Sequence, residues 1–291
     1  EGLQADEYLY DMNGNMIRDA NKGISSISYN YLNLPEKVNL PNGDYVKYTY
    51  DATGMKLSKE TTVGADLDYV GPIHYRNGAI EFIQTSEGRV VKSGGTYNHE
   101  YDLTDHLGNV RATVNSSGTV VQRDDYYPFG GRFNTGVSND NKYLYNGKEL
   151  QDETQVYDYG WRHYDPWIGR FSQIDRFIEN YMPVSPYSYV ANNPIKNVDI
   201  NGDYITIMGE DKYGNKYSVL YENRKAYHYS KDKYGNIIKG DEYDGSNEFI
   251  ENAIVDLNRI ADTGEGGEVV GQLTTSTSEY GINKASSLTG S

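Results

Sequence analysis

Short segments of the chain alternate polar and apolar residues. The clearest stretch is segment 45–50, which reads Tyr-Val-Lys-Tyr-Thr-Tyr. A period of two places every second side chain on the same face of an extended strand. The pattern therefore predicts β-strands with one packed face and one exposed face.

The period changes near the C-terminus. Apolar residues at positions 249, 250, 253, 254, 257, 260 and 261 recur at a helical spacing, which predicts an amphipathic helix. Ser246 is the expected N-cap of this helix and Gly264 its expected stop. A shorter helix is predicted over 265–273, and the polar end 274–291 is expected to fray.

Turn signals separate the predicted strands. The pattern Tyr-Asp-x-x-Gly occurs at 10–14 and again at 50–54, and Asp-Lys-Tyr-Gly-Asn occurs at 211–215 and at 232–236. The Asp carboxylate can accept backbone amides within a turn, and Gly supplies the positive φ that reverses the chain. Repeated turns of this kind predict stacked hairpins.

Composition agrees with many short strands joined by tight turns. The chain has 30 Tyr, against 6 Phe and 2 Trp, together with 31 Gly. The amphipathic Tyr ring packs well on a half-exposed pleated face. Cysteine is absent, which excludes disulfides and thiolate metal sites.

Charge and hydropathy limit the binding partners. The formal net charge is -15, so a broad basic face for nucleic acid is not expected. No run of about 18 apolar residues occurs, so we expect no membrane-spanning segment. The first residues, Glu-Gly-Leu, lack an initiator Met, which suggests a fragment of a longer chain.

A dense set of short words fills the middle of the chain. Tyr-Asp-Tyr-Gly, Arg-His-Tyr-Asp-Pro, Gly-Arg-Phe and Asn-Asn-Pro follow one another within 157–202, after Asp-His-Leu-Gly-Asn at 105–109, Tyr-Tyr-Pro-Phe-Gly at 126–130 and Tyr-Leu-Tyr-Asn-Gly-Lys-Glu at 143–149. In this order the words closely resemble the core module of RHS/YD-repeat proteins. The resemblance covers about residues 5–202 and is strongest over 99–202.

The resemblance implies a mainly β fold. An antiparallel YD-repeat β-shell or spiral would be closed by an RHS core plug and followed by a small α+β segment. We expect YD-repeat hairpins over 1–98, the RHS core over 99–202 and a variable, toxin-like cargo over 203–291. Packing residues of the plug would be Tyr159, Trp161, Tyr164, Pro166, Trp167 and Phe171.

Some members of the family cut their own chain after the core with aspartates. Two carboxyls that share one proton can act as base and acid on a water molecule that attacks the peptide bond. The matching positions are Asp175 and Asp199, with Arg170 to orient them, and the cut would follow Gly202. A structural role competes with this one: both aspartates could cap turns and pair with Arg162, Arg170 or Arg176.

Two departures from the family pattern bear on cleavage. The usual Asp-Pro pairs read Asp175-Arg176 and Asp199-Ile200 here, and Asp203 follows Gly202 where relatives that cleave carry an apolar residue. An acidic residue at that point fits an apolar pocket poorly and adds charge beside the carboxylates.

Other catalytic signals are weak. The five histidines are scattered, with no HExxH and no G-x-S-x-G, so no complete catalytic motif, metal site or cofactor is predicted. His106 and His163 lie within family words and are predicted to be turn or core residues. Segment 253–273 resembles the opening helices of effector-type zinc metallopeptidases.

The leading hypothesis is a shell and core portion of a secreted or cell-surface bacterial polymorphic toxin that encloses a C-terminal effector. A secretion apparatus and an immunity protein would be its partners. The alternatives are a carbohydrate-binding surface adhesin, in which exposed Tyr and Trp stack on sugars, and a truncated metallopeptidase toxin.

Overall fold

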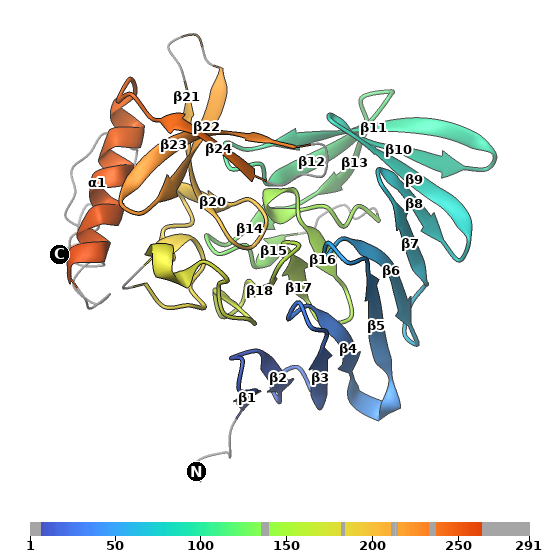
Figure 1. Cartoon of the computed structure of the whole chain (residues 1–291). Coiled ribbons are helices and arrows are strands. Elements are labelled where there is room, and N and C mark those ends of the chain that lie inside the picture. Colours follow the sequence, from blue (N-terminus) through green and yellow to red (C-terminus); the bar gives the residue numbers. More distant parts are fainter. Residues whose placement is uncertain are drawn as a thin grey trace, which may run out of the picture.

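The fold is almost entirely antiparallel β-structure (Figure 1). The computed structural model describes residues 7–134, 140–181, 184–210, 213, 215–232 and 237–263. Within these ranges it contains five sheets and one α-helix. The mainly β fold class that the sequence predicts is confirmed.

The largest sheet has eleven strands, and each strand pairs with its neighbours in the chain. A short hairpin of two strands, β1 (Tyr8–Tyr10) and β2 (Met16–Asp19), precedes it. The eleven strands are β3 (Ser26–Tyr29), β4 (Pro35–Asn39), β5 (Tyr45–Tyr50), β6 (Lys56–Thr61), β7 (Leu67–Val70), β8 (Ile73–Arg76), β9 (Ala79–Thr85), β10 (Gly88–Ser93), β11 (Thr96–Thr104), β12 (Val110–Asn115) and β13 (Val120–Arg123). The boundary expected between residues 98 and 99 lies inside β11.

The predicted turns at 10–14 and 50–54 form as their sequences indicate, whereas those at 211–215 and 232–236 include residues outside the described ranges. Asp51 Oδ1 accepts the backbone amides of Thr53 at 2.8 Å and Met55 at 3.0 Å, and Gly54 has a φ of 84°. Asp11 caps the equivalent turn before β2 in the same way. The Asp carboxylate thus replaces backbone partners that a tight turn leaves unpaired.

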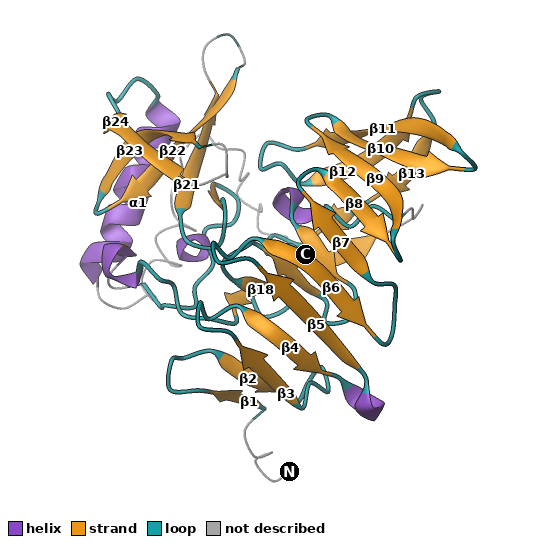
Figure 2. Ribbon diagram, turned by 45° about the vertical axis from the view of Figure 1, so that its right-hand side comes forward, coloured by secondary structure: helices purple, strands orange, loops and turns teal. Residues whose placement is uncertain are grey.

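A small four-stranded sheet forms the core against which the large sheet packs (Figure 2). Its strands are β16 (Glu149–Gln151), β17 (Val156–Asp158), β18 (His163–Asp165) and β19 (Arg170–Phe171), and a two-stranded sheet of β14 (Asp125–Tyr126) and β15 (Arg132–Asn134) precedes it. Single 3-10 turns lie at Pro41–Gly43, Tyr145–Gly147, Ile178–Tyr181 and Val190–Asn192.

Tyrosine fills the interior of this core. Its buried apolar cluster is Leu144, Tyr145, Leu150, Tyr157, Tyr159, Tyr164, Phe171, Tyr189 and Val190. The hydroxyl of Tyr164 donates to the Phe129 carbonyl at 2.8 Å, and that of Tyr159 donates to Asn146 Oδ1 at 2.7 Å. Because each hydroxyl donates to an acceptor, these rings are buried without leaving an unsatisfied polar group.

Most of the expected plug residues are buried, with two exceptions. Tyr159, Tyr164, Pro166 and Phe171 are buried, whereas Trp161 is half-buried. The expectation for Trp167 was wrong, since its side chain is 58% exposed. Trp167 lies in the turn between β18 and β19, where the chain turns away from the core.

A five-stranded sheet and the α-helix complete the fold, away from strands β7–β10 (Figures 1 and 2). The strands are β20 (Asn197–Asp199), β21 (Ile205–Glu210), β22 (Lys216–Glu222), β23 (Lys225–Lys231) and β24 (Ile237–Glu242), and the helix is α1 (Glu248–Thr263). Since β20 precedes Gly202, this sheet includes residues from both sides of the boundary expected between 202 and 203.

The predicted helix is confirmed, and its cap is shifted by one residue. Ile250, Ala253 and Leu257 on one face of α1 are buried. Asn247 is the cap in place of Ser246, because Asn247 Oδ1 accepts the Ile250 amide at 3.2 Å. The predicted stop at 264, the helix over 265–273 and the end 274–291 lie outside the described residues.

Buried ion pairs fasten the large sheet to the core. Lys56 of β6 lies 2.6 Å from Glu149 of β16 and 2.6 Å from Asp158 of β17. Burial opposes the charge on Lys56, but the two carboxylates raise its pKa well above the ordinary value. Burial likewise opposes ionisation of Asp158, yet Lys56 lowers its pKa to about 2. All three groups therefore stay charged and joined.

Replacing Lys56 with Ala should lower the free energy of unfolding by about 3–5 kcal/mol, because two buried carboxylates would lose their cation. Lys47→Ala is the matched control: the Lys47–Glu60 pair is about half exposed and should contribute less than about 1 kcal/mol. Urea unfolding of both variants measures the difference. Equal losses would show that the Lys56 cluster does not fasten the sheet.

Candidate functional site

Arg162 lies at the centre of a buried cluster of charged groups. It occupies the turn between β17 and β18, and the residue is only 2% exposed. Its Nη2 lies 2.7 Å from Asp175 Oδ2 and 3.4 Å from Asp199 Oδ2. Its Nε donates to the carbonyl oxygen of Gly202. One guanidinium thus contacts both predicted carboxylates and the peptide unit that follows them.

Asp199 shapes the turn that carries Gly202. It ends β20, and its Oδ1 accepts the backbone amides of Asn201 at 3.1 Å, Gly202 at 2.5 Å and Asp203 at 3.2 Å. The chain then pairs back along β20 as β21. The predicted cut therefore lies in a hairpin turn whose amides converge on one carboxylate.

Glycine is required in this turn. Gly202 has a φ of 86°, and a Cβ at this position would lie 2.9 Å from the backbone nitrogen of Arg162. Both the backbone conformation and the close approach exclude a side chain. The Gly202 carbonyl is consequently held against the Arg162 guanidinium.

Burial makes both aspartates hold protons more tightly than usual. Burial raises the pKa of Asp175 to about 6, against the opposing effect of Arg162. The pKa of Asp199 is also raised by burial, again opposed by Arg162. Asp175 Oδ1 accepts the Phe177 amide at 2.8 Å, so Asp175 caps a turn as well. Asp175 therefore holds a proton at a pH closer to neutral than an exposed aspartate does.

A second ion pair lies beside the cluster. The Asp203 side chain is fully buried, and its carboxylate accepts from Arg176 Nε at 3.1 Å and from Arg176 Nη2. The guanidinium of Arg176 lies 3.3 Å from the ring centre of Trp161. Asp203 is therefore not an uncompensated charge beside Asp175 and Asp199.

The structure brings two of the three predicted site residues together. Asp175 and Asp199 meet on Arg162, whereas Arg170 is exposed and lies over the ring of Tyr187, 5.4 Å from its centre. None of the described contacts of Arg170 reaches either aspartate. The arginine that lies between the two aspartates is Arg162, and the orienting role predicted for Arg170 has no contact in the described residues to support it.

Sequence reasoning treated Arg162 only as one of three pairing partners. The signal for its importance was its place in the Arg-His-Tyr-Asp-Pro word, at the end of the turn of the β17–β18 hairpin. His163, the next residue, is buried, and its ring meets the Tyr48 ring edge-on with 5.6 Å between the ring centres. It is a core residue, as predicted, and His106 lies in the turn before β12, also as predicted.

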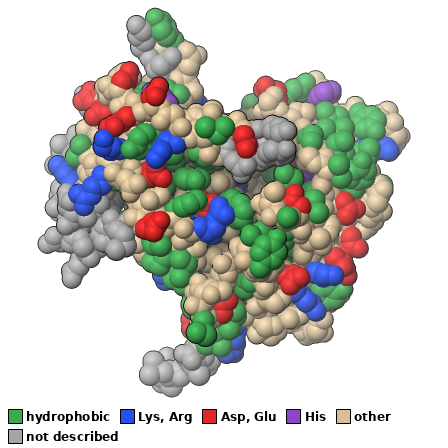
Figure 3. Space-filling model, in the orientation of Figure 1, with side chains coloured by type: hydrophobic (Ala, Val, Ile, Leu, Met, Phe, Trp, Pro, Cys, Tyr) green, Lys and Arg blue, Asp and Glu red, His purple; other side chains and the backbone are tan. Residues whose placement is uncertain are grey.

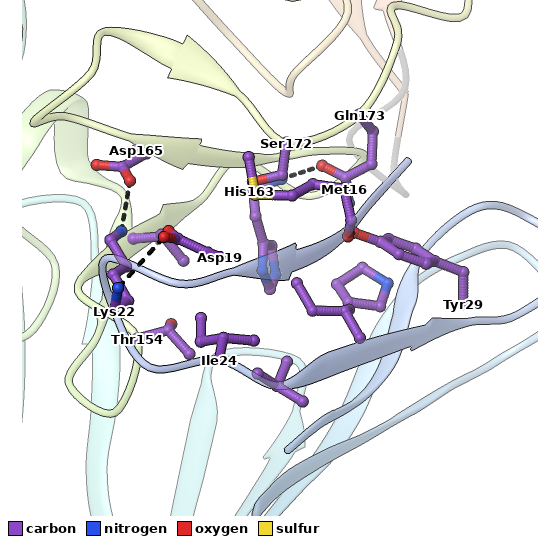
Figure 4. Close-up of a pocket in the computed structure, with 14 residues that line it drawn as sticks. Met16, Asp19, Lys22, Ile24, Tyr29, Thr154, His163, Asp165, Ser172 and Gln173 are labelled. Carbon is purple, nitrogen blue, oxygen red and sulfur yellow. Dashed lines mark hydrogen bonds and ion pairs between the residues drawn. The ribbon is translucent and has the colours of Figure 1, made fainter. Parts of the chain in front are cut away.

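A separate pocket lies where the first hairpin meets the core (Figure 4). It shares no residue with the Arg162 cluster, and it offers about 30 Å³ to water-sized molecules. Besides Lys22 Nζ, which forms an ion pair with Asp165, three buried polar atoms along it, on Thr154, His163 and Gln173, have no hydrogen-bond partner. This volume holds only about one or two waters. The pocket is a small polar cavity between the first hairpin and the core, and it is too small for an organic substrate.

Neither a metal site nor a membrane span is found in the part of the chain that the structure describes. No three His, Asp or Glu side chains there come together to hold a metal ion. The described helix is too short and too polar to cross a membrane. Figure 3 shows acidic and basic side chains interspersed over one face of the molecule.

The chain resembles known proteins in sequence and in fold. No family model matches the chain. It is 40% identical over 103 residues to Salivary gland surface protein 1 of Aedes aegypti (34% of the chain, 3% of the relative), and 33% identical over 110 residues to Toxin subunit YenC1 of Yersinia entomophaga (35% and 11%). It is 26% identical over 210 residues to the tRNA3(Ser)-specific nuclease WapA of Bacillus spizizenii (69% and 8%).

A solved structure shows the same fold. The crystal structure of TcdB2-TccC3-Cdc42 matches 67% of the chain, and 11% of the solved one, with a TM-score of 0.58 at 24% identity. The chain is similar to RHS-type toxin proteins. It spans at most 11% of the length of the relatives named here. A secreted or cell-surface location is supported by relatives that include a surface protein and a toxin subunit.

The Gly202→Ala variant should lose about 2–4 kcal/mol of unfolding free energy, because backbone strain and a close contact add together. Gly147→Ala is the matched control: Gly147 also has a positive φ, of 66°, but a Cβ there meets nothing within 4 Å. Strain alone should cost the control about 1 kcal/mol. Urea unfolding of both variants is the measurement. A control loss as large as that of Gly202→Ala would contradict the close packing of Gly202 on Arg162.

Proposed function

We propose that this chain is the core portion of an RHS-type toxin that encloses and presents a C-terminal effector segment. We further propose that Asp175 and Asp199 cut the peptide bond between Gly202 and Asp203. The observation that carries the second proposal is the position of Arg162, which contacts both carboxylates and the carbonyl oxygen of Gly202.

The geometry suits peptide hydrolysis. The hydrogen bond from Arg162 polarises the Gly202 carbonyl and would stabilise negative charge on its oxygen during attack. One ionised carboxylate takes a proton from the attacking water, whose oxygen bonds to the carbonyl carbon of Gly202. The protonated partner gives its proton to the nitrogen of Asp203 as the C–N bond breaks. Asp199 Oδ1 accepts a hydrogen bond from that nitrogen at 3.2 Å, so Asp199 is the ionised carboxylate beside the bond, and Asp175, whose pKa burial raises to about 6, is the protonated partner.

The same contacts also stabilise the fold. Asp175 and Asp199 each cap a turn and pair with Arg162, as the structural alternative predicted. Loss of either carboxylate therefore affects folding as well as chemistry, and a test of cleavage has to monitor both.

Enclosure rests on the arrangement of the sheets. The large sheet and the core precede the turn at Gly202, and the proposed effector segment 203–291 begins within a sheet that contains β20. After a cut, β20 and β21 would remain paired, so the segment would stay bound without a covalent link. We propose a secretion apparatus and an immunity protein as partners. The similarity of 253–273 to metallopeptidases stays a prediction, because 264–273 lie outside the described residues.

Self-cleavage predicts two fragments that meet between residues 202 and 203, detected by intact mass after days at neutral pH. Asp175→Asn and Asp199→Asn should each slow their appearance by at least about 100-fold, as expected for loss of an acid or a base. Asp124→Asn is the matched control, since Asp124 is a fully buried aspartate paired with Arg132 elsewhere in the core. Circular dichroism checks that each variant is folded. An intact wild-type chain, or folded aspartate variants that cut at the wild-type rate, would contradict the proposal.

One observation favours carbohydrate binding as a second candidate function. Trp167, Tyr127 and Phe133 are each more than half exposed, and the Tyr127 ring centre lies 4.7 Å from Phe133 and 6.5 Å from Trp167. A groove of about 430 Å³ lined by Trp167 and Arg170 adjoins them. Clustered exposed aromatic rings beside polar groups are typical of surfaces that bind sugars or proteins.

If sugars bind here, Trp167→Ala should weaken glycan binding at least about tenfold, the loss expected for a central aromatic contact. Tyr31→Ala is the control, because Tyr31 is 79% exposed and does not belong to this group. A glycan array with the wild-type chain and both variants makes the comparison. The absence of any wild-type signal, or an equal effect of both variants, would reject this function.

A further inference from the structure

Arg176 and Asp203 each directly follow a residue of the proposed cleavage site. Arg176 directly follows Asp175, one of the two carboxyl groups, and Asp203 directly follows Gly202, whose carbonyl would be attacked. These are also positions where the chain departs from the family words. The ion pair between them joins the residue after a carboxyl group to the residue after the bond to be cut.

The Arg176 guanidinium is well placed to bind the Asp203 carboxylate. Asp203 is fully buried, and a buried carboxylate is stable only when it is paired and hydrogen-bonded. Arg176 approaches it with Nε, at 3.1 Å, and with Nη2, which is the two-pronged geometry that guanidinium prefers with carboxylates.

Trp161 fixes the direction of the Arg176 side chain. The guanidinium carbon lies over the indole, 3.3 Å from the ring centre, and such contacts attract a cation to the ring. The backbone amide of Trp161 in turn donates to the carbonyl of Asn201 at 3.0 Å. Trp161 therefore connects Arg176 to the residue just before Gly202, so the turn is held on both sides.

We infer that Arg176 is a specificity-determining residue, which recognises the Asp203 carboxylate and thereby sets the Gly202–Asp203 bond in place for hydrolysis. This inference rests on the proposed self-cleavage. It explains how an acidic residue is accepted directly after the cut: the cation at position 176 replaces an apolar partner. The two departures from the family words thus compensate for each other.

Four full-length chains test the inference: wild type, Arg176→Leu, Asp203→Leu and the double variant. Intact mass over time gives the rate of cutting, and thermal unfolding by circular dichroism shows whether each chain is folded. Arg176→Leu leaves the buried Asp203 carboxylate without its cation, and Asp203→Leu removes the group that Arg176 recognises, so both should cut at least about tenfold more slowly than wild type. The double variant restores an apolar pair and should recover to within about threefold of wild type.

The preference at position 203 should therefore reverse. With Arg176 present, the chain should cut faster with Asp203 than with Asp203→Leu, and in the Arg176→Leu background the order should be the opposite. A residue that only stabilised the fold would shift unfolding temperatures without reversing this order of rates.

The possible failures are distinguishable. Folded single variants that cut as fast as wild type would overturn the recognition by Arg176 and leave the self-cleavage proposal standing. A double variant no faster than the slower single variant would overturn it too. No cut in any of the four chains would overturn the self-cleavage proposal and this inference together. If the leucine variants unfold, Arg176→Gln and Asp203→Asn are substituted singly and together, with the same expected order.

Discussion

A guanidinium buried in the protein interior is the constraint on which this site depends. Arg162 is 2% exposed, and a buried cation of this kind is stable only when anions and hydrogen-bond acceptors surround it. Asp175, Asp199 and the Gly202 carbonyl supply them. The requirement to satisfy one side chain therefore brings together three segments that are distant in the sequence. It also fixes the turn between β20 and β21.

The surrounding layers make this burial possible. Tyrosine rings close the core, and their hydroxyls are paired with acceptors inside it. The large sheet covers the core and is fastened to it by the cluster at Lys56. The core and its contact with the large sheet both combine apolar packing with a few buried charges. In such an interior, charges cost much when unpaired and specify a unique arrangement when paired.

Sequence patterns predicted the parts of the fold that depend on local geometry. The alternation over 45–50 matches β5, the Asp turns at 10–14 and 50–54 form as their sequences indicate, and the helical period matches α1. Asn247 caps the helix in place of Ser246 because two neighbouring residues could both serve as a cap. The order of strands in the large sheet follows the order of the chain, which is the simplest outcome for repeated hairpins.

The site was predicted less completely because its contacts are long-range. The words of the family pointed to Asp175 and Asp199 and to Arg170, whereas the cation that contacts both aspartates is Arg162. Arg170 and Phe171 are neighbours in β19, so their side chains point to opposite faces. Phe171 is buried in the core, and Arg170 faces solvent. The pairing of Arg176 with Asp203 likewise needs the tertiary fold, since 27 residues separate them.

The central claim is that burial beside Arg162 leaves the Asp175 carboxyl able to hold a proton close to neutral pH. Carbon-13 NMR of labelled aspartate measures this directly, with the Asp175 signal identified by its loss in Asp175→Asn. The account predicts a titration midpoint at a pKa of about 6. A midpoint near or below about 4, the ordinary value for aspartate, would contradict it.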